Sequence, residues 1–256
     1  MTMSNIEWAR LKASELNEQA KSGAIVLLPV ASTEQHGPHL PVGVDADLCG
    51  EICRRAALKL VAGGWPAVVA PTLWCGLAEH HTAFGGTFTL TLPTYLAVLK
   101  DLCRSILRAG FQRILIVNGH GGNMTALNAF SEELTRELDN PIAVTTYWLL
   151  AEEPFGALLE DQRSVLHACE AETSMMMALH PDLVDRERLA DARGPMARQA
   201  GQTLNRPLHR WRSFKEITAS GVIGDARRAS AEKGERLLEA AAEAIAERLA
   251  RGEPWA

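Results

Sequence analysis

The sequence has few cysteines, and no two of them form a recognisable pair. Five are present among 256 residues, an odd number without a C-x-x-C motif. This pattern argues against a disulfide framework and predicts reduced thiols, for which the cytoplasm is the natural compartment. The chain also lacks an apolar run near the roughly 20 residues that cross a bilayer. An apolar signal-peptide core is missing from the N-terminal segment MTMSNIEWARLKASELNEQAKSG. We therefore expect a soluble, unprocessed protein with no membrane partner.

The chain also lacks an excess of positive charge. Lys and Arg total 26 against 31 Asp and Glu, which gives a formal net charge of −5. Such a balance supplies no general attraction to nucleic acid or to an anionic membrane, so we expect neither as a partner. A chain of this length buries roughly three quarters of the surface that its unfolded form exposes. It needs no structural metal to fold, and any bound metal would serve chemistry.

Apolar blocks alternate with amphipathic stretches along most of the chain. The apolar runs predict strands at 24–30, 66–71, 113–117 and 141–147. Apolar residues at helical spacing predict helices at 46–61, 94–109, 124–138 and about 230–251, with Thr94 as an N-cap. Strands that alternate with helices imply right-handed crossovers and a parallel sheet covered on both faces. The predicted fold class is α/β, and the aperiodic stretch 193–214 is expected to wrap the surface.

Internal repeats, low-complexity segments and linker-like composition are absent from the sequence. We therefore predict a single domain over residues 1–256. Ligands of open parallel sheets bind beyond the carboxyl ends of the strands, where loops and helix N-termini meet. The loops after the predicted strands are thus the place to look for chemistry.

The loop after the first strand is rich in carboxylates and imidazoles. Glu34 and His36 are two residues apart and point the same way if the chain is extended, and Asp45 can return to them at the start of the next helix. Such ligands suit Zn²⁺, Mn²⁺ or Fe²⁺, and a carboxylate can bridge two ions. The plainer alternative is that Glu34 caps a turn, that Asp45 caps the helix and that the histidines are surface residues.

Two further clusters follow in the chain. His120 stands in the loop Asn118–Gly–His–Gly–Gly–Asn123, where the flanking glycines let the imidazole reach inward and leave N–H groups for an oxyanion. The loop lacks the nucleotide-binding glycine patterns, and its alternative is an ordinary turn. His167 and Glu172 lie at the start of a helix expected near residue 170, where one of them can complete a metal shell or Glu172 can simply cap the helix.

These motifs together resemble the creatininase family. The resemblance runs from about residue 25 to 234 and rests on these strings: L-P-V-A-S-T-E-Q-H-G-P-H-L-P at 28–41 with Asp45, N-G-H-G-G-N at 118–123, E-T-S at 172–174, G-V-I-G-D at 221–225 and A-S-A-E-K-G at 229–234. It implies a three-layer α/β/α fold with a mostly parallel central sheet. It also implies a metal-dependent hydrolase of C–N bonds that assembles as a homo-oligomer, often a hexamer.

The resemblance also implies roles for individual residues. Glu34, Asp45 and His120 are the implied ligands of one divalent ion. His36 and the bridging Asp45 are the implied ligands of a second ion. Creatinine amidohydrolase has a glutamate two positions after the histidine that matches His120, where this chain has Gly122. In family members with the N-G-H-G-G-N form, the glutamate that matches Glu172 is the implied replacement, and it completes the second set. The family's S-x-E-H-x-x-F-P-G-T pattern is altered here, because His80 replaces the glutamate before His81 and Gly85 the proline.

The expected function is the hydrolysis of a C–N bond in a small cyclic or linear amide by a metal-activated water. The expected cofactors are two divalent ions, Zn²⁺ and/or Mn²⁺, with Fe²⁺ possible. Catalysis is assigned to Glu172 and His167, and substrate binding to His81, Gly121, Gly122 and Asn123. Three alternatives stand beside this function: a peptidase of the mycofactocin-precursor type and a carbocyclic ketone hydrolase on the same metals, and a metal-free binding or scaffolding protein.

Overall fold

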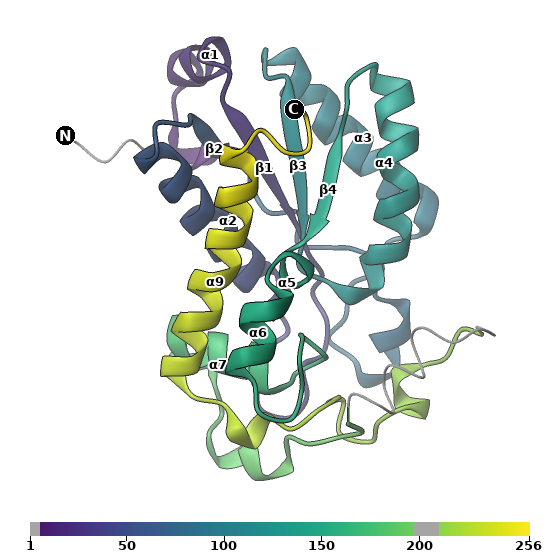
Figure 1. Cartoon of the computed structure of the whole chain (residues 1–256). Coiled ribbons are helices and arrows are strands. Elements are labelled where there is room, and N and C mark those ends of the chain that lie inside the picture. The colour runs from purple at the N-terminus through teal and green to yellow at the C-terminus, as the bar shows by residue number, and fades with distance from the viewer. Residues whose placement is uncertain (1–5, 197–209) are drawn as a thin grey trace.

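The central element is a parallel sheet (Figure 1). The structure is a computed structural model that describes residues 6–196 and 210–256. In this part of the chain four strands form one sheet in the order β2-β1-β3-β4, and each neighbouring pair is parallel. The strands are β1 (Ile25–Val30), β2 (Ala67–Val69), β3 (Arg113–Asn118) and β4 (Ala143–Thr146). Each lies within its predicted range or ends one residue beyond it, so the predicted strands are confirmed.

Strand β1 is buried along its whole length. Ile25 and Leu27 pack into one apolar cluster, whereas Val26, Leu28 and Val30 pack into another on the opposite face. Side chains alternate between the two faces of a strand, so a continuous apolar run is stable only where helices cover both faces. The apolar run that predicted a central strand is explained by this double cover.

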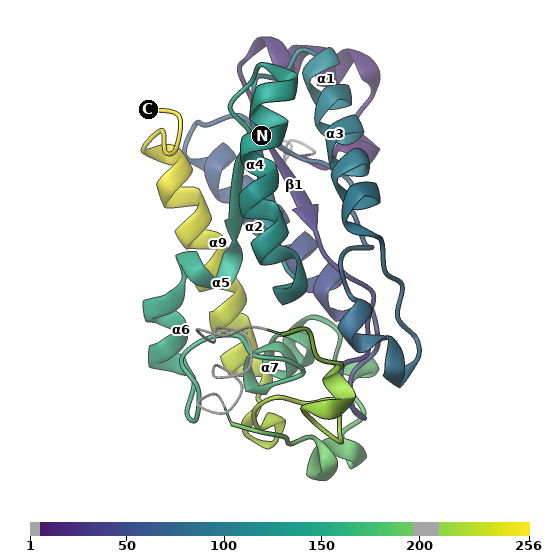
Figure 2. The same cartoon turned by 90° about the vertical axis from the view of Figure 1, so that its right-hand side faces the viewer.

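Helices form a layer on each face of the sheet (Figures 1 and 2). One layer holds α2 (Val44–Ala62), α5 (Tyr147–Leu150), α6 (Glu152–Leu158) and α9 (Ala231–Ala250), and the other holds α1 (Ala13–Lys21), α3 (Leu92–Arg108) and α4 (Met124–Leu138). Helix α7 (Glu170–Leu179) packs against α9 beyond the carboxyl ends of the strands. The predicted α/β/α architecture is confirmed.

Two predicted helix starts differ from the structure. Helix α3 begins at Leu92 with Thr91 as its N-cap, so the prediction of Thr94 as the cap is wrong. Pro93, in the first turn, has a φ suited to a helix start, and the Thr94 hydroxyl instead lies 2.8 Å from that of Thr91. Helix α2 begins at Val44, which places Asp45 inside its first turn rather than at the cap.

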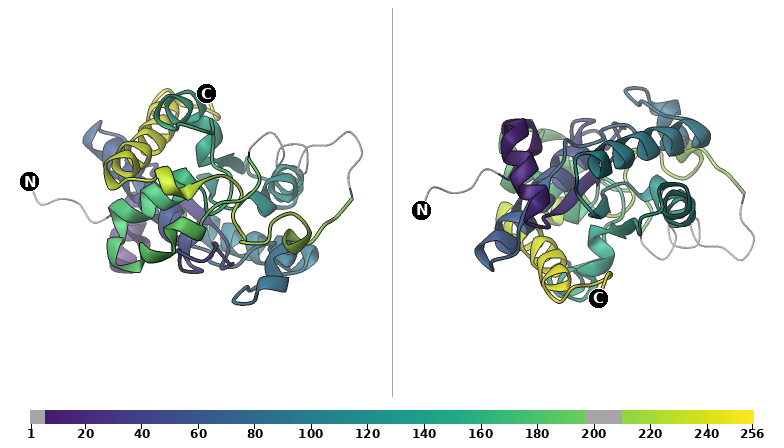
Figure 3. Two further views of the ribbon diagram at one scale, coloured as in Figure 1. Left: turned by 90° about the horizontal axis from the view of Figure 1, so that it is seen from below. Right: turned by 90° about the horizontal axis from the view of Figure 1, so that it is seen from above.

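The register of the sheet brings several loops to one edge. Val30 pairs with Asn118, so β1 and β3 end side by side, and the Gly119 amide donates to the Val30 carbonyl at 2.9 Å. Short 3₁₀ helices then line this edge: η2 (Glu79–Phe84), η3 (Gly121–Asn123), η6 (Phe214–Glu216) and η7 (Ala226–Arg228). Seen from below, the described segments between α6 and α9, at 159–196 and 210–230, lie across it (Figure 3). The carboxyl edge of the sheet is therefore enclosed by chain from both halves of the sequence.

Two predictions about the rest of the chain can be compared with the structure. All five cysteines are free and buried, in agreement with the expected reduced thiols. Among the described residues no helix is both long and apolar enough to cross a membrane. The stretch predicted to wrap the surface at 193–214 lies in large part, at 197–209, outside the described residues.

Candidate metal centre

The loop after β1 carries Glu34 and His36 into the interior. The Glu34 amide donates to the Val42 carbonyl at 3.0 Å, and this contact closes the loop on itself. The Nδ1 of His36 lies 3.0 Å from the Glu34 carbonyl oxygen. A carbonyl only accepts, so Nδ1 carries the proton and Nε2 is the nitrogen left for a ligand. Both side chains are almost fully buried, so the alternative of surface histidines in a polar loop fails at His36.

Asp45 stands at the centre of the cluster. Its Oδ1 lies 3.1 Å from His36 Nε2, and its Oδ2 lies 3.1 Å from His120 Nδ1. The first turn of α2 places the carboxylate near the positive end of the helix dipole. Burial alone would raise the pKa of Asp45, but His36 and His120 hold that pKa well below its usual range. Asp45 is thus an ionised carboxylate shared between two imidazoles.

His120 is aimed inward by the turn that ends β3. The Asn118 side chain accepts from the His120 amide at 3.0 Å and donates to the His120 carbonyl at 2.8 Å. The ring's Nε2 donates to the Leu77 carbonyl at 3.1 Å, which leaves Nδ1 facing Glu34 and Asp45. Although burial lowers it, the carboxylates of Glu34 and Asp45 raise the pKa of His120 well above its usual value.

Helix α7 contributes Glu172. This carboxylate is buried, and one of its oxygens lies within 4.8 Å of ligand atoms of both His36 and Asp45. Burial raises the pKa of Glu172 to about 7, although His36 lowers it. Glu170, two residues earlier, instead forms an ion pair with Lys233 of α9. The pair holds Glu170 to α9 and explains why Glu172 is the carboxylate that joins the cluster.

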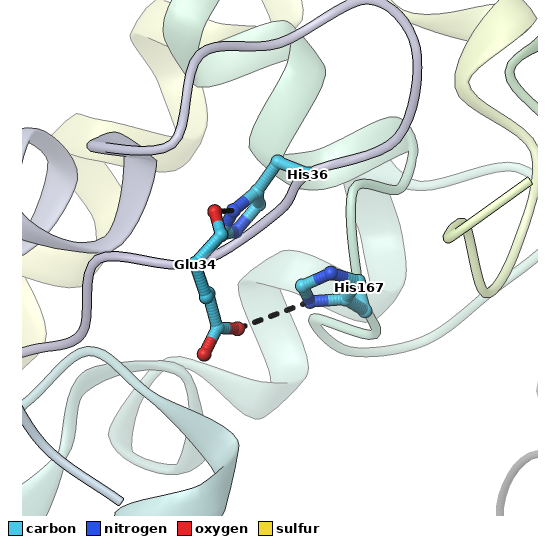
Figure 4. Close-up of side chains that lie close together, drawn as sticks. All are labelled: Glu34, His36 and His167. Carbon is cyan, nitrogen blue, oxygen red and sulfur yellow. Dashed lines mark hydrogen bonds and ion pairs between the residues drawn. The ribbon is translucent and has the colours of Figure 1, made fainter. Parts of the chain in front are cut away.

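Ligand atoms converge in three groups among the described residues. The groups are Glu34–His36–His167, Glu34–Asp45–His120 and His36–Asp45–Glu172, with the atoms of each within 4.8 Å of one another. Figure 4 shows the first, in which His167 Nδ1 lies 3.5 Å from Glu34 Oε1. The second and third share Asp45, the arrangement expected of a carboxylate that bridges two ions.

Three carboxylate oxygens of this cluster lack hydrogen bonds from the described residues. Both oxygens of Glu34 and Oδ2 of Asp45 are buried and accept no hydrogen bond from the described part of the chain, although imidazole nitrogens lie 3.1–3.5 Å away. Unpaired buried carboxylate oxygens are costly, and divalent cations satisfy them. His36 fits the same picture: burial would lower its pKa, but Asp45 raises that pKa to about 9, so Nε2 strongly attracts a positive charge. The residues present therefore fit divalent metal ions.

A second layer of imidazoles lies beside Glu34. His81 of η2 places Nε2 3.1 Å from Glu34 Oε1 and Nδ1 3.0 Å from Gln35 Nε2. Burial and the neighbouring imidazoles lower the pKa values of His81 and His167, so both rings are neutral. Phe214 of η6 packs against both, with ring centroids 4.1 Å from His81 and 4.9 Å from His167. This wall limits solvent access to the cluster.

The predicted substrate-binding residues Gly121, Gly122 and Asn123 differ in how exposed they are and in what surrounds them. Gly121 is exposed, and a Cβ there would meet nothing within 4 Å. Gly122 is crowded: a Cβ would lie 2.4 Å from His120 Nε2 and 2.4 Å from the Leu77 carbonyl. The Asn123 amide accepts from the Leu77 amide at 2.9 Å and donates to the Ala31 carbonyl at 3.3 Å. Asn123 ties the loops together, and its predicted contact with substrate stays a prediction.

Two residues of the site were not singled out from the sequence. Gln35 lies between two predicted ligands, so its position in the E-Q-H motif was a usable signal. Phe214 ends an aperiodic stretch and carried no such signal. Its place against His81 and His167 depends on how the chain after residue 210 folds back over the carboxyl edge of the sheet.

A buried cluster of carboxylates and imidazoles at the carboxyl edge of a parallel sheet, inside an α/β/α fold, defines the class of metal-dependent hydrolases. The sequence model of the creatininase family, described as creatinine amidohydrolase, matches residues 9–249. The chain belongs to the creatininase family and is a hydrolase of that family. The two enzymatic alternatives, a peptidase and a ketone hydrolase, are activities of relatives in this same family, whereas the family match favours a hydrolase over the scaffolding alternative.

Relatives with different activities match at similar levels. Creatinine amidohydrolase from Pseudomonas putida is 30% identical over 248 residues, which cover 90% of each chain. The mycofactocin precursor peptide peptidase of Mycolicibacterium smegmatis is 30% identical over 232 residues, which cover 90% of this chain and 86% of that one. The 3-dehydro-scyllo-inosose hydrolase of Thermotoga maritima is 28% identical over 243 residues, which cover 88% and 76%.

Solved structures agree with the fold along nearly the whole chain. A crystal structure of creatinine amidohydrolase superposes with a TM-score of 0.84 at 28% identity, covering 98% of this chain and 99% of that one. A creatininase described as the Mn form gives a TM-score of 0.83 at 26% identity, covering 98% and 100%. A variant creatininase described as Zn–Zn type gives 0.81 at 26% identity, covering 98% and 99%.

Proposed function

We propose that this protein is an amidohydrolase that opens a C–N bond in a small cyclic or linear amide at a centre of two divalent metal ions. The observation that carries the proposal is the sharing of Asp45 between two groups of ligand atoms. Two adjacent sites joined by one carboxylate are the usual construction of two-metal hydrolases. Metal-bound relatives of the same fold support it.

The ligands divide into two sets. Glu34, Asp45 and His120 would hold one ion, and His36, Asp45 and Glu172 the other. Glu172 takes the place of a ligand that the loop after β3 does not supply here, because Gly122 has no carboxylate and no space for one. We propose Zn²⁺ and Mn²⁺ as the ions, with Fe²⁺ as a further possibility, since mixed imidazole and carboxylate sites suit all three.

The chemistry divides between the ions and the protein. When bound, the ions supply a water activated at neutral pH and polarise the substrate carbonyl. His167 is neutral, and its Nδ1 faces the cluster, so it is placed to take a proton and pass it to the leaving nitrogen. Glu172 shares this candidate role. The backbone N–H groups of Gly121 and Gly122 are proposed to bind the oxyanion, and His81 to contact substrate.

Two relatives favour a second candidate bond. The peptidase from Mycolicibacterium smegmatis matches this chain as well as creatinine amidohydrolase does, and the inosose hydrolase matches nearly as well. The same metal centre would then cleave a precursor peptide or open a carbocyclic ketone. A panel of cyclic amides, linear formamides, short peptides and cyclic ketones, followed for released amine, formate or carboxylate, separates these functions. Turnover of the peptide or ketone alone would contradict the small-amide assignment.

Assembly, compartment and domain organisation complete the proposal. We propose one domain over residues 1–256, because the candidate ligands are spread from Glu34 to Glu172 and the last helix, α9, holds α7 in place. We propose a homo-oligomer, a hexamer by the family resemblance, and a cytoplasmic location on the basis of five free cysteines. Light scattering of the purified protein tests the subunit number.

Metal analysis tests the central claim. Glu34→Ala and His120→Ala should each lose metal and activity together, whereas Trp74→Ala, at an exposed side chain with no ligand atom, should keep its metal. The measurement is elemental analysis of protein purified without chelator. Wild-type protein that holds far less than one ion per chain, or a Glu34→Ala variant with full metal content, would overturn the two-metal proposal.

A further inference from the structure

Gln35 is a buried residue that links four segments around the candidate centre. Its side chain reaches His81 in η2, His167 before α7, and the backbone of Gly37 and Gly221. It stands between two proposed metal ligands, yet its amide is a poor metal ligand beside carboxylates and imidazoles. Its contacts with two imidazoles point to a different role.

The orientation of the Gln35 amide follows from backbone groups alone. Oε1 lies 2.9 Å from the Gly37 amide nitrogen, which can only donate. Nε2 lies 3.1 Å from the Gly221 carbonyl oxygen, which can only accept. The two ends of the amide are therefore distinguishable, and one of the two Nε2 protons is used at Gly221. One proton remains for an imidazole.

The His167 ring cannot receive that proton. Its Nε2 lies 2.8 Å from the backbone carbonyl oxygen of Gln35, which only accepts, so this nitrogen carries a proton of its own. The Gln35 Nε2 atom is also close to it, at 2.9 Å, but two donors do not bond. The second Gln35 proton therefore goes to His81 Nδ1, 3.0 Å away.

We infer that Gln35 is a positioning residue that sets the tautomers of both histidines: its side chain puts the His81 proton on Nε2, and its backbone carbonyl puts the His167 proton on Nε2. The His81 N–H then faces Glu34 Oε1 at 3.1 Å, off the line of a hydrogen bond. His167 presents the bare Nδ1 to the cluster (Figure 4). This inference rests on the proposed function in one respect: in the proposed hydrolysis, the bare Nδ1 of His167 is the atom that accepts the proton.

The segment after η6 holds Gln35 in this orientation. Gly221 has φ +82°, and a Cβ there would lie 2.0 Å from Gln35 Oε1. Two residues on, Ile223 exchanges backbone hydrogen bonds with His167, at 2.9 and 3.3 Å. The G-V-I-G motif at 221–224 thus supports both Gln35 and His167. This contact connects the motif directly to the candidate metal centre.

Nitrogen NMR of the wild-type protein tests the inference directly. In metal-free protein labelled with ¹⁵N-histidine, long-range proton–nitrogen correlations distinguish Nε2–H from Nδ1–H rings. We expect the Nε2–H pattern for both His81 and His167, assigned by its loss in His81→Gln and His167→Gln. An Nδ1–H pattern at either ring overturns the inference. Because no metal or substrate is needed, this result is independent of the proposed function.

A substitution separates the two halves of the inference. Gln35→Met keeps the length of the side chain and removes its donor, so His81 should lose its pure Nε2–H pattern while His167 keeps it through the backbone carbonyl. Gln162→Met, at another buried glutamine that donates to the Ser164 carbonyl, should change neither ring. If Gln35→Met does not fold, Gly221→Ala should disturb His81 instead. An unchanged His81 in a folded Gln35 or Gly221 variant contradicts the role.

The metal content of the same proteins, measured before the metal is removed for NMR, keeps the two failures apart. Unexpected tautomers in protein that binds its metals normally would remove only the role of Gln35. Expected tautomers in protein that binds no metal would leave that role and remove the two-metal proposal.

Discussion

Gly234 of α9 lies directly against the backbone of Ser174 in α7: a Cβ at Gly234 would be 1.8 Å from the Ser174 carbonyl oxygen. The two helices can approach this closely only because position 234 has no side chain. The Ser174 hydroxyl adds to the contact by accepting from the Ser230 amide at 3.2 Å. This packing fixes α7, and with it the position of Glu172.

Gly234→Ala should therefore weaken both the fold and the centre. A methyl group that meets backbone must push α7 away, at a cost of about 3 kcal/mol by the usual magnitude of overpacking. Urea unfolding should show this loss, and Glu172 should bind its ion more weakly. Arg236→Ala, at an exposed position of the same helix, serves as the control and should change neither quantity. Wild-type stability in Gly234→Ala would contradict the close packing.

Asp45→Asn should remove more metal than either His120→Ala or His36→Ala. Asp45 belongs both to the group Glu34–Asp45–His120 and to the group His36–Asp45–Glu172. Of these two groups, His120 belongs only to the first and His36 only to the second. His120→Ala and His36→Ala are each expected to lower the content by one ion, and Asp45→Asn to lower it by two. Elemental analysis of the three variants checks this order. Equal losses in all three would argue against Asp45 as a bridge.

The sequence was sufficient to predict the strands and the clustering of five candidate ligands. Each of Glu34, His36, Asp45 and His120 lies just after a buried apolar strand or just inside the next helix, and parallel strands bring such positions to one edge. Glu172 was predicted with less to distinguish it from Glu170. The difference is that Glu170 pairs with Lys233, which lies far along the chain in α9. A contact between residues so far apart in the sequence leaves no local sequence pattern.

The surroundings of the ligands were harder to predict. Gln35 was visible in its motif, but its role depends on the backbone of Gly221 and on two imidazoles from separate segments. The crowding at Gly122 depends on Leu77 and His80, which come from a different loop. The start of α3 at Leu92 was missed because its first turn contains Pro93 and exposed residues, so apolar spacing gave no sign of it.

Gly122→Glu should not create a metal ligand in this protein. Its Cβ would meet His120 Nε2 and the Leu77 carbonyl at 2.4 Å, the two groups whose hydrogen bond aims His120 inward. The expected result is a lower metal content than in wild type, by elemental analysis. Gly121→Ala is the matched control, since a Cβ there meets nothing within 4 Å, and it should keep its metal. A Gly122→Glu variant with more metal than wild type would show that the loop can open.

Lys233→Met should be strongly destabilising although Lys233 lies outside the centre. The Lys233 ammonium pairs with Glu170, whose side chain is 1% exposed, and also reaches Glu160 at 3.0 Å. Without it the only partner that the described residues leave to the buried Glu170 carboxylate is the Glu160 amide, at 3.2 Å, and breaking such a buried pair costs about 3–5 kcal/mol. Adding Glu170→Gln should recover part of the loss, because no charge is then left buried. Lys100→Met, which breaks a solvent-screened pair with Glu137, should cost far less than Lys233→Met. Urea unfolding of the three variants decides the case: equal losses from Lys233→Met and Lys100→Met, or no recovery in the double variant, would mean that Glu170 is not held by this pair.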